Sequence, residues 1–156
     1  MQRLLPPFLF LPLLALSIAI GLGLPVLGPW PWTIRLLGIP IAIGALWLNL
    51  GAAVRFTRND VNIVTFLDPT DLVTDGRFAW TRNPMYLGFE LMLAGTAFIV
   101  GTLTAWLGAI VFFVVADRWY IPFEERRLAA VFGERYDAYR QTVRRWCGRR
   151  TGGAAP

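Results

Sequence analysis

The chain has 156 residues and contains no histidine, no lysine and a single cysteine. The missing histidine excludes Ser-His-Asp and Cys-His catalysis, and with only one cysteine it also excludes a zinc site built from these two ligands. One cysteine cannot form a disulfide within the chain. We therefore expect no metal, and we expect any chemistry to depend on carboxylates, arginines, aromatic groups, backbone groups or a bound cofactor.

Charge is also scarce, because charged residues make up 16% of the chain and hydrophobic residues 56%. An average soluble domain is about 25% charged and about 45–50% apolar. All 15 basic residues are arginine, and the net charge is +5. A basic protein can bind nucleic acid, but here the arginines lie beside long apolar runs. Membrane orientation explains them better, so we expect no nucleic-acid partner.

Four apolar stretches are long enough to cross a bilayer, which takes about 20 residues per helix. They cover residues 4–24, 33–54, 85–103 and 104–123. The first is longer than the apolar core of a signal peptide and lacks a clear cleavage site, so we interpret it as an uncleaved span. The short turn at 101–104 predicts a tight helical hairpin of the last two spans. The sequence thus predicts an all-α, polytopic membrane bundle.

The arginines also predict the orientation and the domain organisation. The turns at 28–32 and 101–104 carry no charge, so the positive-inside rule places both termini and the loop at 55–84 in the cytoplasm. The arginine-rich, lysine-free composition favours a bacterial inner membrane as the host membrane. Apolar residues spaced by three or four predict an amphipathic cytoplasmic helix at 124–146, after a helix break at Pro122. Gly133 weakens this helix and is a candidate position for a bend. We expect one membrane domain over 1–148 and a disordered tail at 149–156.

Three ionisable residues fall inside the predicted spans: Glu90, Asp117 and Arg118. Such residues are costly in a bilayer and are candidates for function. Glu90 lies six residues after Pro84, and Arg118 lies six residues before Glu124, so their depths match. Either Glu90 and Arg118 form a structural pair, or Arg118 extends to the membrane interface, or these groups line a polar pocket that opens to the cytoplasm.

Two more polar groups lie at the cytoplasmic ends of the spans. Arg82, Asn83 and Tyr86 place a cation, an amide and a phenol at a helix N-terminus, which is a favourable site for an anion. The alternative is that Asn83 and Pro84 only start the helix. Glu124-Glu125 point to different sides of their helix, and they either stabilise a helix N-terminus or receive an ammonium or sulfonium group.

These motifs, in this order, carry a family resemblance. They are Arg82-Asn83-Pro84-Met85-Tyr86-Leu87-Gly88, Glu124-Glu125-Arg126-Arg127-Leu128 and Phe132-Gly133-Glu134-Arg135-Tyr136-Asp137-Ala138-Tyr139. Over residues 68–146 the chain resembles the integral-membrane methyltransferases that include isoprenylcysteine carboxyl methyltransferase and the phospholipid N-methyltransferases. The resemblance implies a small helical bundle that binds S-adenosylmethionine at its cytoplasmic end and receives a lipid substrate from the bilayer.

The resemblance also implies roles for single residues. The residues that shape the cofactor pocket would be Arg82, Asn83, Pro84 and Tyr86. Glu124 and Glu125 would hold the amino group or the ribose of the cofactor. The site would be closed by Tyr136, Tyr139 and Arg145. The chain departs from the family pattern at Asn83, where many members have histidine, and at Arg77 and Arg144, where many have proline. Because of these departures, the resemblance does not identify the substrate.

Methyl transfer from a sulfonium needs orientation and a dry site, and it needs no metal or nucleophilic side chain. A carboxylate acceptor would be held by Arg82, Arg118 or Arg145, whereas an amine would need Glu90 to take or direct its proton. We therefore expect the catalytic residues to be Glu90, Arg118 and Arg145. The competing functions are a membrane reductase that uses NADPH and a membrane scaffold without catalysis.

Overall fold

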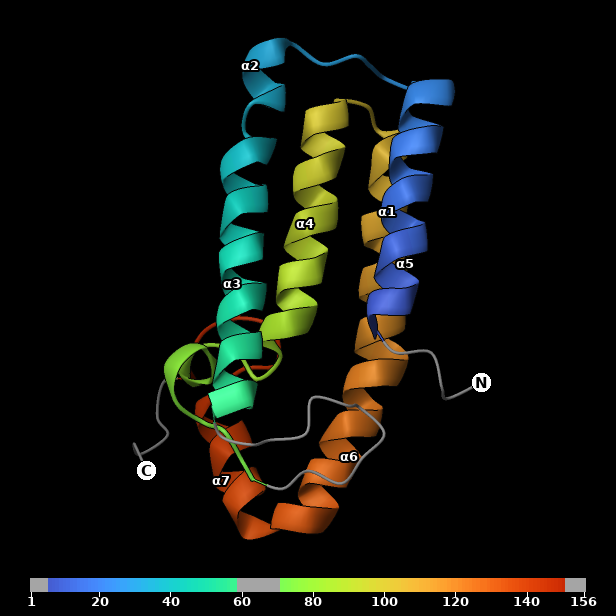
Figure 1. The fold of residues 1–156 in the computed structure, drawn as a ribbon. Helices are drawn as coiled ribbons and strands as arrows, with labels where there is room; N and C mark the ends of the chain where they lie inside the picture. The colour runs from blue at the N-terminus through green and yellow to red at the C-terminus, as the bar shows by residue number, and fades with distance from the viewer. Residues whose placement is uncertain (1–5, 59–70, 151–156) are drawn as a thin grey trace.

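The computed structural model describes residues 6–58 and 71–150, which form an elongated helical bundle (Figure 1). Within these ranges the regular structure is helical, apart from one isolated bridge between Val143 and Arg149. The predicted all-α class is therefore confirmed. Most of the middle of the long loop and the end of the predicted tail, at 59–70 and 151–156, lie outside the described residues.

Three helical segments in the described ranges are long and apolar enough to cross a membrane, at Pro6–Gly23, Trp32–Gly51 and Thr104–Phe132. The first is helix α1, and the second joins the short helix α2 (Trp32–Arg35) to α3 (Gly38–Arg58). Helix α4 (Pro84–Val100) is apolar as well but has only 17 residues. The predicted count of four spans therefore depends on α4.

Helix α4 packs one face closely against α3, and small residues allow that approach. A Cβ atom at Gly95 would lie 2.9 Å from the carbonyl oxygen of Gly38, and one at Gly88 would lie 2.6 Å from the amide group of Asn49. Both distances are shorter than a normal contact. Glycine is thus required where these two backbones meet, as is common for packed membrane helices.

The opposite face of α4 contributes to the main hydrophobic core. This core lies between α4, α1 and the helix that begins with η2 (Thr104–Trp106) and α5 (Leu107–Val115). Its buried members are Phe10, Leu13, Tyr86, Leu93, Ala109, Phe112, Ala116 and Ile121. The core therefore reaches from the middle of the bundle to the end where α4 begins.

The predicted helix break at Pro122 is wrong. Helix α5 continues through a π-helical turn, η3 (Ala116–Tyr120), directly into α6 (Ile121–Phe132). Proline has no N–H to offer the carbonyl four residues earlier. A π turn pairs carbonyls with amides five residues later instead, which accommodates the proline near the start of α6 without ending the helix.

The single amphipathic helix predicted at 124–146 is also wrong. Helix α6 ends at Gly133, whose φ of +50° suits glycine and few other residues. Helix α7 (Glu134–Thr142) then runs in a new direction, and the chain after Val143 is no longer helical (Figure 1). The break turns the last residues of the described chain back beneath the bundle.

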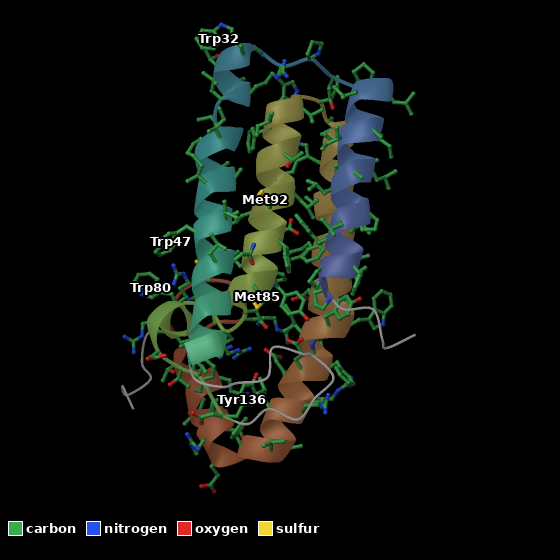
Figure 2. All side chains as sticks on the ribbon, in the orientation of Figure 1. Trp32, Trp47, Trp80, Met85, Met92 and Tyr136 are labelled. Carbon is green, nitrogen blue, oxygen red and sulfur yellow. The ribbon has the colours of Figure 1, made fainter. Side chains whose placement is uncertain are left out.

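The two ends of the bundle differ in what they carry (Figures 1 and 2). Helices α6 and α7 lie at one end, with Tyr136, while α2 and Trp32 lie at the other. Arg35, the basic residue of the second end, donates from Nε to the carbonyl oxygen of Ile99 at 2.7 Å. This arginine therefore satisfies the C-terminal end of α4, next to the turn at Gly101.

Candidate active site

The start of α4, helix α6 and the segment after α7 meet at the end of the bundle that carries α7. Pro84 is the first residue of α4, and Asn83 precedes it. The side chain of Asn83 does not cap the helix; its Nδ2 donates to the carbonyl oxygen of Arg145 at 3.1 Å. The hydroxyl of Thr81 donates to the same carbonyl at 3.3 Å. The amide of Asn83 therefore fixes the C-terminal segment against α4.

Glu125 is the centre of an ion-pair network. Its Oε1 accepts from Nη2 of Arg82 at 2.6 Å, and its Oε2 accepts from Nη2 of Arg145 at 2.7 Å. The Arg82 side chain is nearly buried, with 9% exposed, whereas that of Arg145 is partly exposed at 32%. Side-chain hydrogen bonding to Glu125 is the largest cause that raises the pKa of Arg145.

Asp117 extends this network into the π-helical turn. Its Oδ1 accepts from Nη1 of Arg145 at 3.2 Å and from the indole Nε1 of Trp146 at 2.9 Å. The aromatic ring of Trp146 also stacks on Phe113, with ring centroids 4.9 Å apart. The C-terminal segment is thus attached to the α5–α6 helix by the ion pairs of Arg145 with Asp117 and Glu125, and by the hydrogen bond and the aromatic contact of Trp146.

Glu124 lies beside Glu125 in sequence but serves a different neighbour. Its Oε1 accepts from the hydroxyl of Tyr86 at 2.8 Å, across the gap between α6 and α4. The predicted divergence of the two adjacent carboxylates is confirmed, because one meets a phenol and the other meets two arginines. The two glutamates together link α6 to the start of α4 and to the C-terminal segment.

Tyr136 and Tyr139 lie on α7 and are buried, with 1% and 8% of their surface exposed. They form a second hydrophobic core with Val73, Phe78 and Val143. The hydroxyl of Tyr139 donates to the carbonyl oxygen of Phe78 at 2.7 Å. Burial, together with the nearby charge of Glu125, raises the pKa of Tyr136 to about 12. Tyr136 therefore lies near the ion-pair network, whereas Tyr139 belongs to the hydrophobic core beside it.

The structure does not bring Glu90 and Arg118 together. Arg118 is 79% exposed, and its Nε lies 3.9 Å from Asp117. Glu90 lies on α4, where its Oε2 is buried and has no hydrogen-bond partner in the described chain. The structural pairing of Glu90 with Arg118, one of our three interpretations, is therefore not formed.

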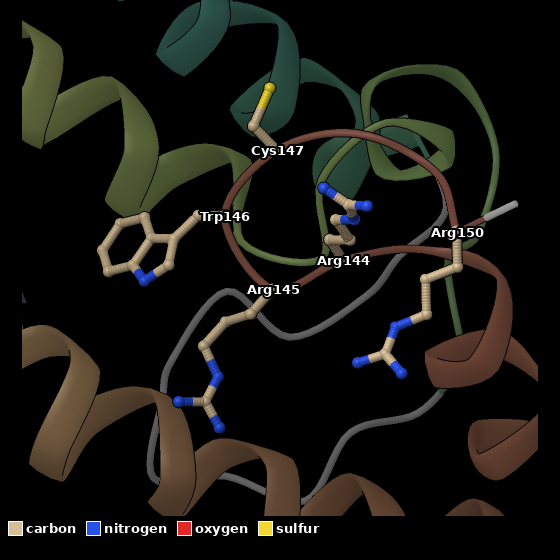
Figure 3. Close-up of a pocket in the computed structure, with 5 residues that line it drawn as sticks. All are labelled: Arg144, Arg145, Trp146, Cys147 and Arg150. Carbon is tan, nitrogen blue, oxygen red and sulfur yellow. The ribbon is translucent and has the colours of Figure 1, made fainter.

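A hollow of about 570 Å³ opens beside the network, lined by Arg144, Arg145, Trp146, Cys147 and Arg150. Figure 3 shows the side chains of Arg145 and Arg150 extending toward the same open space. Arg145 is the residue shared by the hollow and the ion-pair network. The hollow therefore provides an approach to the network from outside the bundle.

Our sequence reasoning placed Asp117 among the groups that line a polar pocket but gave it no role at the site, and it missed Thr81 and Trp146 as site residues. An acid inside an apolar span, seven residues before Glu124, was the available signal for Asp117, since two helical turns place both on one side of the helix. Nothing local in the sequence indicates that Thr81 meets Arg145. Within the described ranges, no group of three or more metal-ligating side chains forms.

The fold and the site define a helical membrane protein with a charged cluster at one end, and comparison with known proteins assigns its family. The model of the phospholipid methyltransferase family matches residues 33–135, so the chain belongs to that family. This match covers α3, α4, α5 and α6, including Arg82, Tyr86 and both glutamates. The family resemblance inferred from the motifs is confirmed.

Individual relatives agree. A protein-S-isoprenylcysteine O-methyltransferase of Schizosaccharomyces pombe is 35% identical over 102 residues, which is 62% of this chain and 42% of the relative. One from Arabidopsis thaliana, form B, is 31% identical over 117 residues, which is 72% of this chain and 58% of the relative. An uncharacterized protein of Haemophilus influenzae is 42% identical over 62 residues, 40% of this chain and 98% of its own length.

The chain spans about half the length of the curated isoprenylcysteine methyltransferases that it matches. No solved structure matches it significantly.

Proposed function

We propose that the chain is an integral membrane methyltransferase that uses S-adenosylmethionine and methylates a lipophilic acceptor, either a carboxylate or an amine, at the cytoplasmic face. In this proposal α4 is the third of four spans and forms a hairpin with the span after it. The acceptor arrives from the bilayer, and the host membrane is a bacterial inner membrane. The family membership and the names of the relatives support methyl transfer.

The charge of the network is the observation that carries the proposal. Three carboxylates, of Asp117, Glu124 and Glu125, face two guanidinium groups, of Arg82 and Arg145. The carboxylates offer acceptors for positive groups, and the guanidinium groups offer donors for a carboxylate. S-Adenosylmethionine carries a sulfonium, an ammonium and a carboxylate, and its net charge is therefore positive.

A second feature of the network fits the same cofactor. The Nε of Arg82 is buried and has no hydrogen-bond partner in the described chain. A buried N–H without a partner is costly, and an anionic oxygen is its best acceptor. The carboxylate of the cofactor suits this donor, while its positive groups suit Glu124 and Glu125. The residues at the site therefore fit the cofactor on both signs of charge.

The bound cofactor would supply an electrophilic methyl group on its sulfonium. The chain's own residues would do the rest. Glu124 and Glu125 hold positive charge, and Tyr86 fixes the direction of the Glu124 carboxylate through its hydrogen bond. Trp146 and the aromatic core restrict water at the inner side. Such orientation and exclusion of water are the main contributions that an enzyme makes to an in-line transfer.

Calorimetry on the purified full chain in lipid nanodiscs tests this function. We expect S-adenosylhomocysteine to bind and NADPH not to bind. Glu125→Ala should weaken binding of S-adenosylhomocysteine at least tenfold, while Glu134→Ala, which removes an exposed glutamate from α7, should leave it unchanged. Binding of NADPH instead would favour a reductase, and binding of neither would favour a scaffold.

A further inference from the structure

We propose that the hollow beside Arg145 is a binding site for a phosphate group, and that this group belongs to the headgroup of an anionic phospholipid. Such a lipid is not a methyl acceptor, so the site goes beyond the proposed function and does not depend on S-adenosylmethionine. The lining of the hollow, its backbone and its position beside a candidate membrane span support the site.

The lining of the hollow is positively charged. Three of the five described residues that line it are arginines, and none of the five is acidic: Arg144, Arg145, Trp146, Cys147 and Arg150. The planar guanidinium of arginine suits phosphate because it offers paired N–H donors. The volume of about 570 Å³ lies within the range of about 300–1,000 Å³ that is usual for small-ligand sites. The hollow is therefore large enough for a lipid headgroup.

Two of the three guanidinium groups carry charge that the described chain does not compensate. Arg145 is paired with Asp117 and Glu125. Arg144 and Arg150 are exposed, and neither side chain has an ion pair or hydrogen bond with the residues that the structure describes. Figure 3 shows Arg145 and Arg150 extending toward the same open space, while Arg144 leaves the turn in another direction. We therefore expect Arg150 to contribute more to anion binding than Arg144.

The backbone holds this lining in a closed turn. The N–H of Arg144 donates to the carbonyl oxygen of Gly148 at 2.9 Å, and the N–H of Arg150 donates to that of Thr142 at 2.8 Å. Gly148 has a φ of +92°, which suits glycine, and its N–H donates to the carbonyl oxygen of Trp80 at 2.7 Å. A site whose frame is already formed loses less entropy when its ligand binds.

The turn lies against the outside of a candidate membrane span. The ring of Trp146 stacks on Phe113, an exposed residue of the segment Thr104–Phe132. Trp80, which bonds the turn, and Trp119, which lies two residues after Asp117, are exposed as well. Exposed tryptophans are typical of the level where the hydrocarbon meets the headgroups. Phospholipid phosphates lie at this level, so the position favours a lipid as the source of the phosphate.

The charge of the headgroup decides which phospholipids fit. Phosphatidylglycerol carries a phosphate without a cation, whereas phosphatidylcholine carries the same phosphate beside a trimethylammonium group that the arginines repel. Phosphatidylglycerol has neither an amine nor a carboxylate and cannot be the acceptor in the proposed methyl transfer. Its binding therefore reports the hollow and not the catalytic reaction.

Cys147 provides a direct measurement, because it lines the hollow and is the only cysteine of the chain. The full chain is placed in nanodiscs of phosphatidylcholine, either alone or with a third of the lipid replaced by phosphatidylglycerol. A third sample contains phosphatidylcholine nanodiscs and inorganic phosphate. All samples have the same ionic strength of about 0.15 M, at which surface charge is screened over about 8 Å. The rate of reaction with uncharged N-ethylmaleimide is then compared.

We expect phosphatidylglycerol to slow the labelling of Cys147 at least threefold, because its headgroup covers the thiol and its charge disfavours the reactive thiolate. Slower labelling with phosphatidylglycerol alone assigns the phosphate to a lipid. Slower labelling with inorganic phosphate as well supports the same anion site and shows that it also accepts free phosphate. Slower labelling with inorganic phosphate but not with phosphatidylglycerol would overturn the lipid source. Equal rates in all three samples would overturn the site.

Arginine variants separate the hollow from the general charge of the lipid surface. In Arg150→Gln we expect the fraction of phosphatidylglycerol that gives half of the protection to rise about fivefold, the usual contribution of one arginine at an anionic surface. The shift should be smaller in Arg144→Gln, and the double variant should show no protection over the same range. Arg126→Gln removes an exposed arginine of α6 that does not line the hollow, and it should behave as the wild type.

Full protection in the double variant would overturn the inference, and so would an equal loss of protection in Arg126→Gln and Arg150→Gln. Both hollow arginines are exposed, so the double variant should melt at the temperature of the wild type. Native mass spectrometry of the delipidated chain gives an independent measurement. We expect it to retain one more phosphatidylglycerol in the wild type than in Arg150→Gln, and equal retention by the two proteins would contradict the site.

Discussion

At the scale of single residues, the two adjacent glutamates near the start of α6 bind different partners. Neighbouring positions on an α-helix differ by about 100° in direction. Glu124 therefore faces the phenol of Tyr86 on α4, and Glu125 faces Arg82 and Arg145. This geometry could be predicted from the sequence, since it follows from helix periodicity alone. The partners of Asn83 could not, because its amide bonds a carbonyl 62 positions away.

The network around Glu125 is also expected to stabilise the fold. Glu125→Ala would leave the buried guanidinium of Arg82 without its charged partner, which costs about 1–3 kcal/mol of unfolding free energy. Glu125→Gln should cost less, because the amide oxygen still accepts a hydrogen bond. Thermal unfolding of both variants, with Glu134→Ala as the control, measures the difference. Equal melting temperatures for Glu125→Ala and the wild type would contradict the assigned contacts.

Tyr136 predicts how stability depends on alkaline pH. Burial raises its pKa in the folded chain to about 12, against an ordinary value of 10.0. Between these values the folded state keeps a proton that the unfolded state has lost, so the contribution is present below about pH 10 and disappears through about pH 12. We expect the melting temperature to fall over this range, and to fall less steeply in Tyr136→Phe. Parallel curves for the two proteins would show that Tyr136 does not contribute.

At the scale of secondary-structure elements, the apolar runs determined where helices form, but not where they bend or end. The sequence rule that proline ends a helix failed at Pro122, because a π turn immediately before α6 accommodates it. The glycine at 133 was visible as a weak point, but only its positive φ shows that the chain reverses there. The contact of Asp117 with Trp146 joins two elements and depends on that reversal.

The contact between α3 and α4 supports a prediction of its own. Gly95→Val places side-chain atoms against the backbone of Gly38, where even a Cβ would lie 2.9 Å from a carbonyl oxygen. Overpacking of this kind costs about 1–3 kcal/mol, so the melting temperature should fall. Gly44→Val on α3 is the matched control, since nothing lies within 4 Å of a Cβ there. An equal loss in both variants would mean that helix propensity, and not contact, is the cause.

At the scale of the whole molecule, helices α6 and α7 and the segment that carries Arg144, Arg145 and Arg150 lie at one end of the bundle, opposite α2 (Figure 1). Arg35 lies at the opposite end, where its side chain donates to a carbonyl oxygen at the end of α4. Its position is therefore explained by this contact and is compatible with the positive-inside rule. The all-helical class and the family followed from composition and motif order. The position of the site in the bundle and the contacts between its residues could be seen only in the folded structure, since they join segments that are far apart in the sequence.

This arrangement predicts that Cys147 faces the cytoplasm. Cys147 is exposed and is the only cysteine of the chain, so a membrane-impermeant maleimide reports its side directly. We expect labelling in inverted membrane vesicles and none in intact spheroplasts. In Cys147→Ser combined with Trp32→Cys, which moves the thiol to the opposite end, the pattern should reverse. Labelling of Cys147 in intact spheroplasts would contradict the proposed orientation.

The central claim is that the network of Arg82, Glu125 and Arg145 belongs to a site for the methyl donor. Binding of S-adenosylhomocysteine to the full chain in nanodiscs, measured by calorimetry for the wild type, Glu125→Ala and Glu134→Ala, tests it most directly. We predict that the ligand binds one site per chain in the wild type and in Glu134→Ala, and at least tenfold more weakly in Glu125→Ala. No binding to the wild type, or equal binding to all three proteins, would contradict the claim.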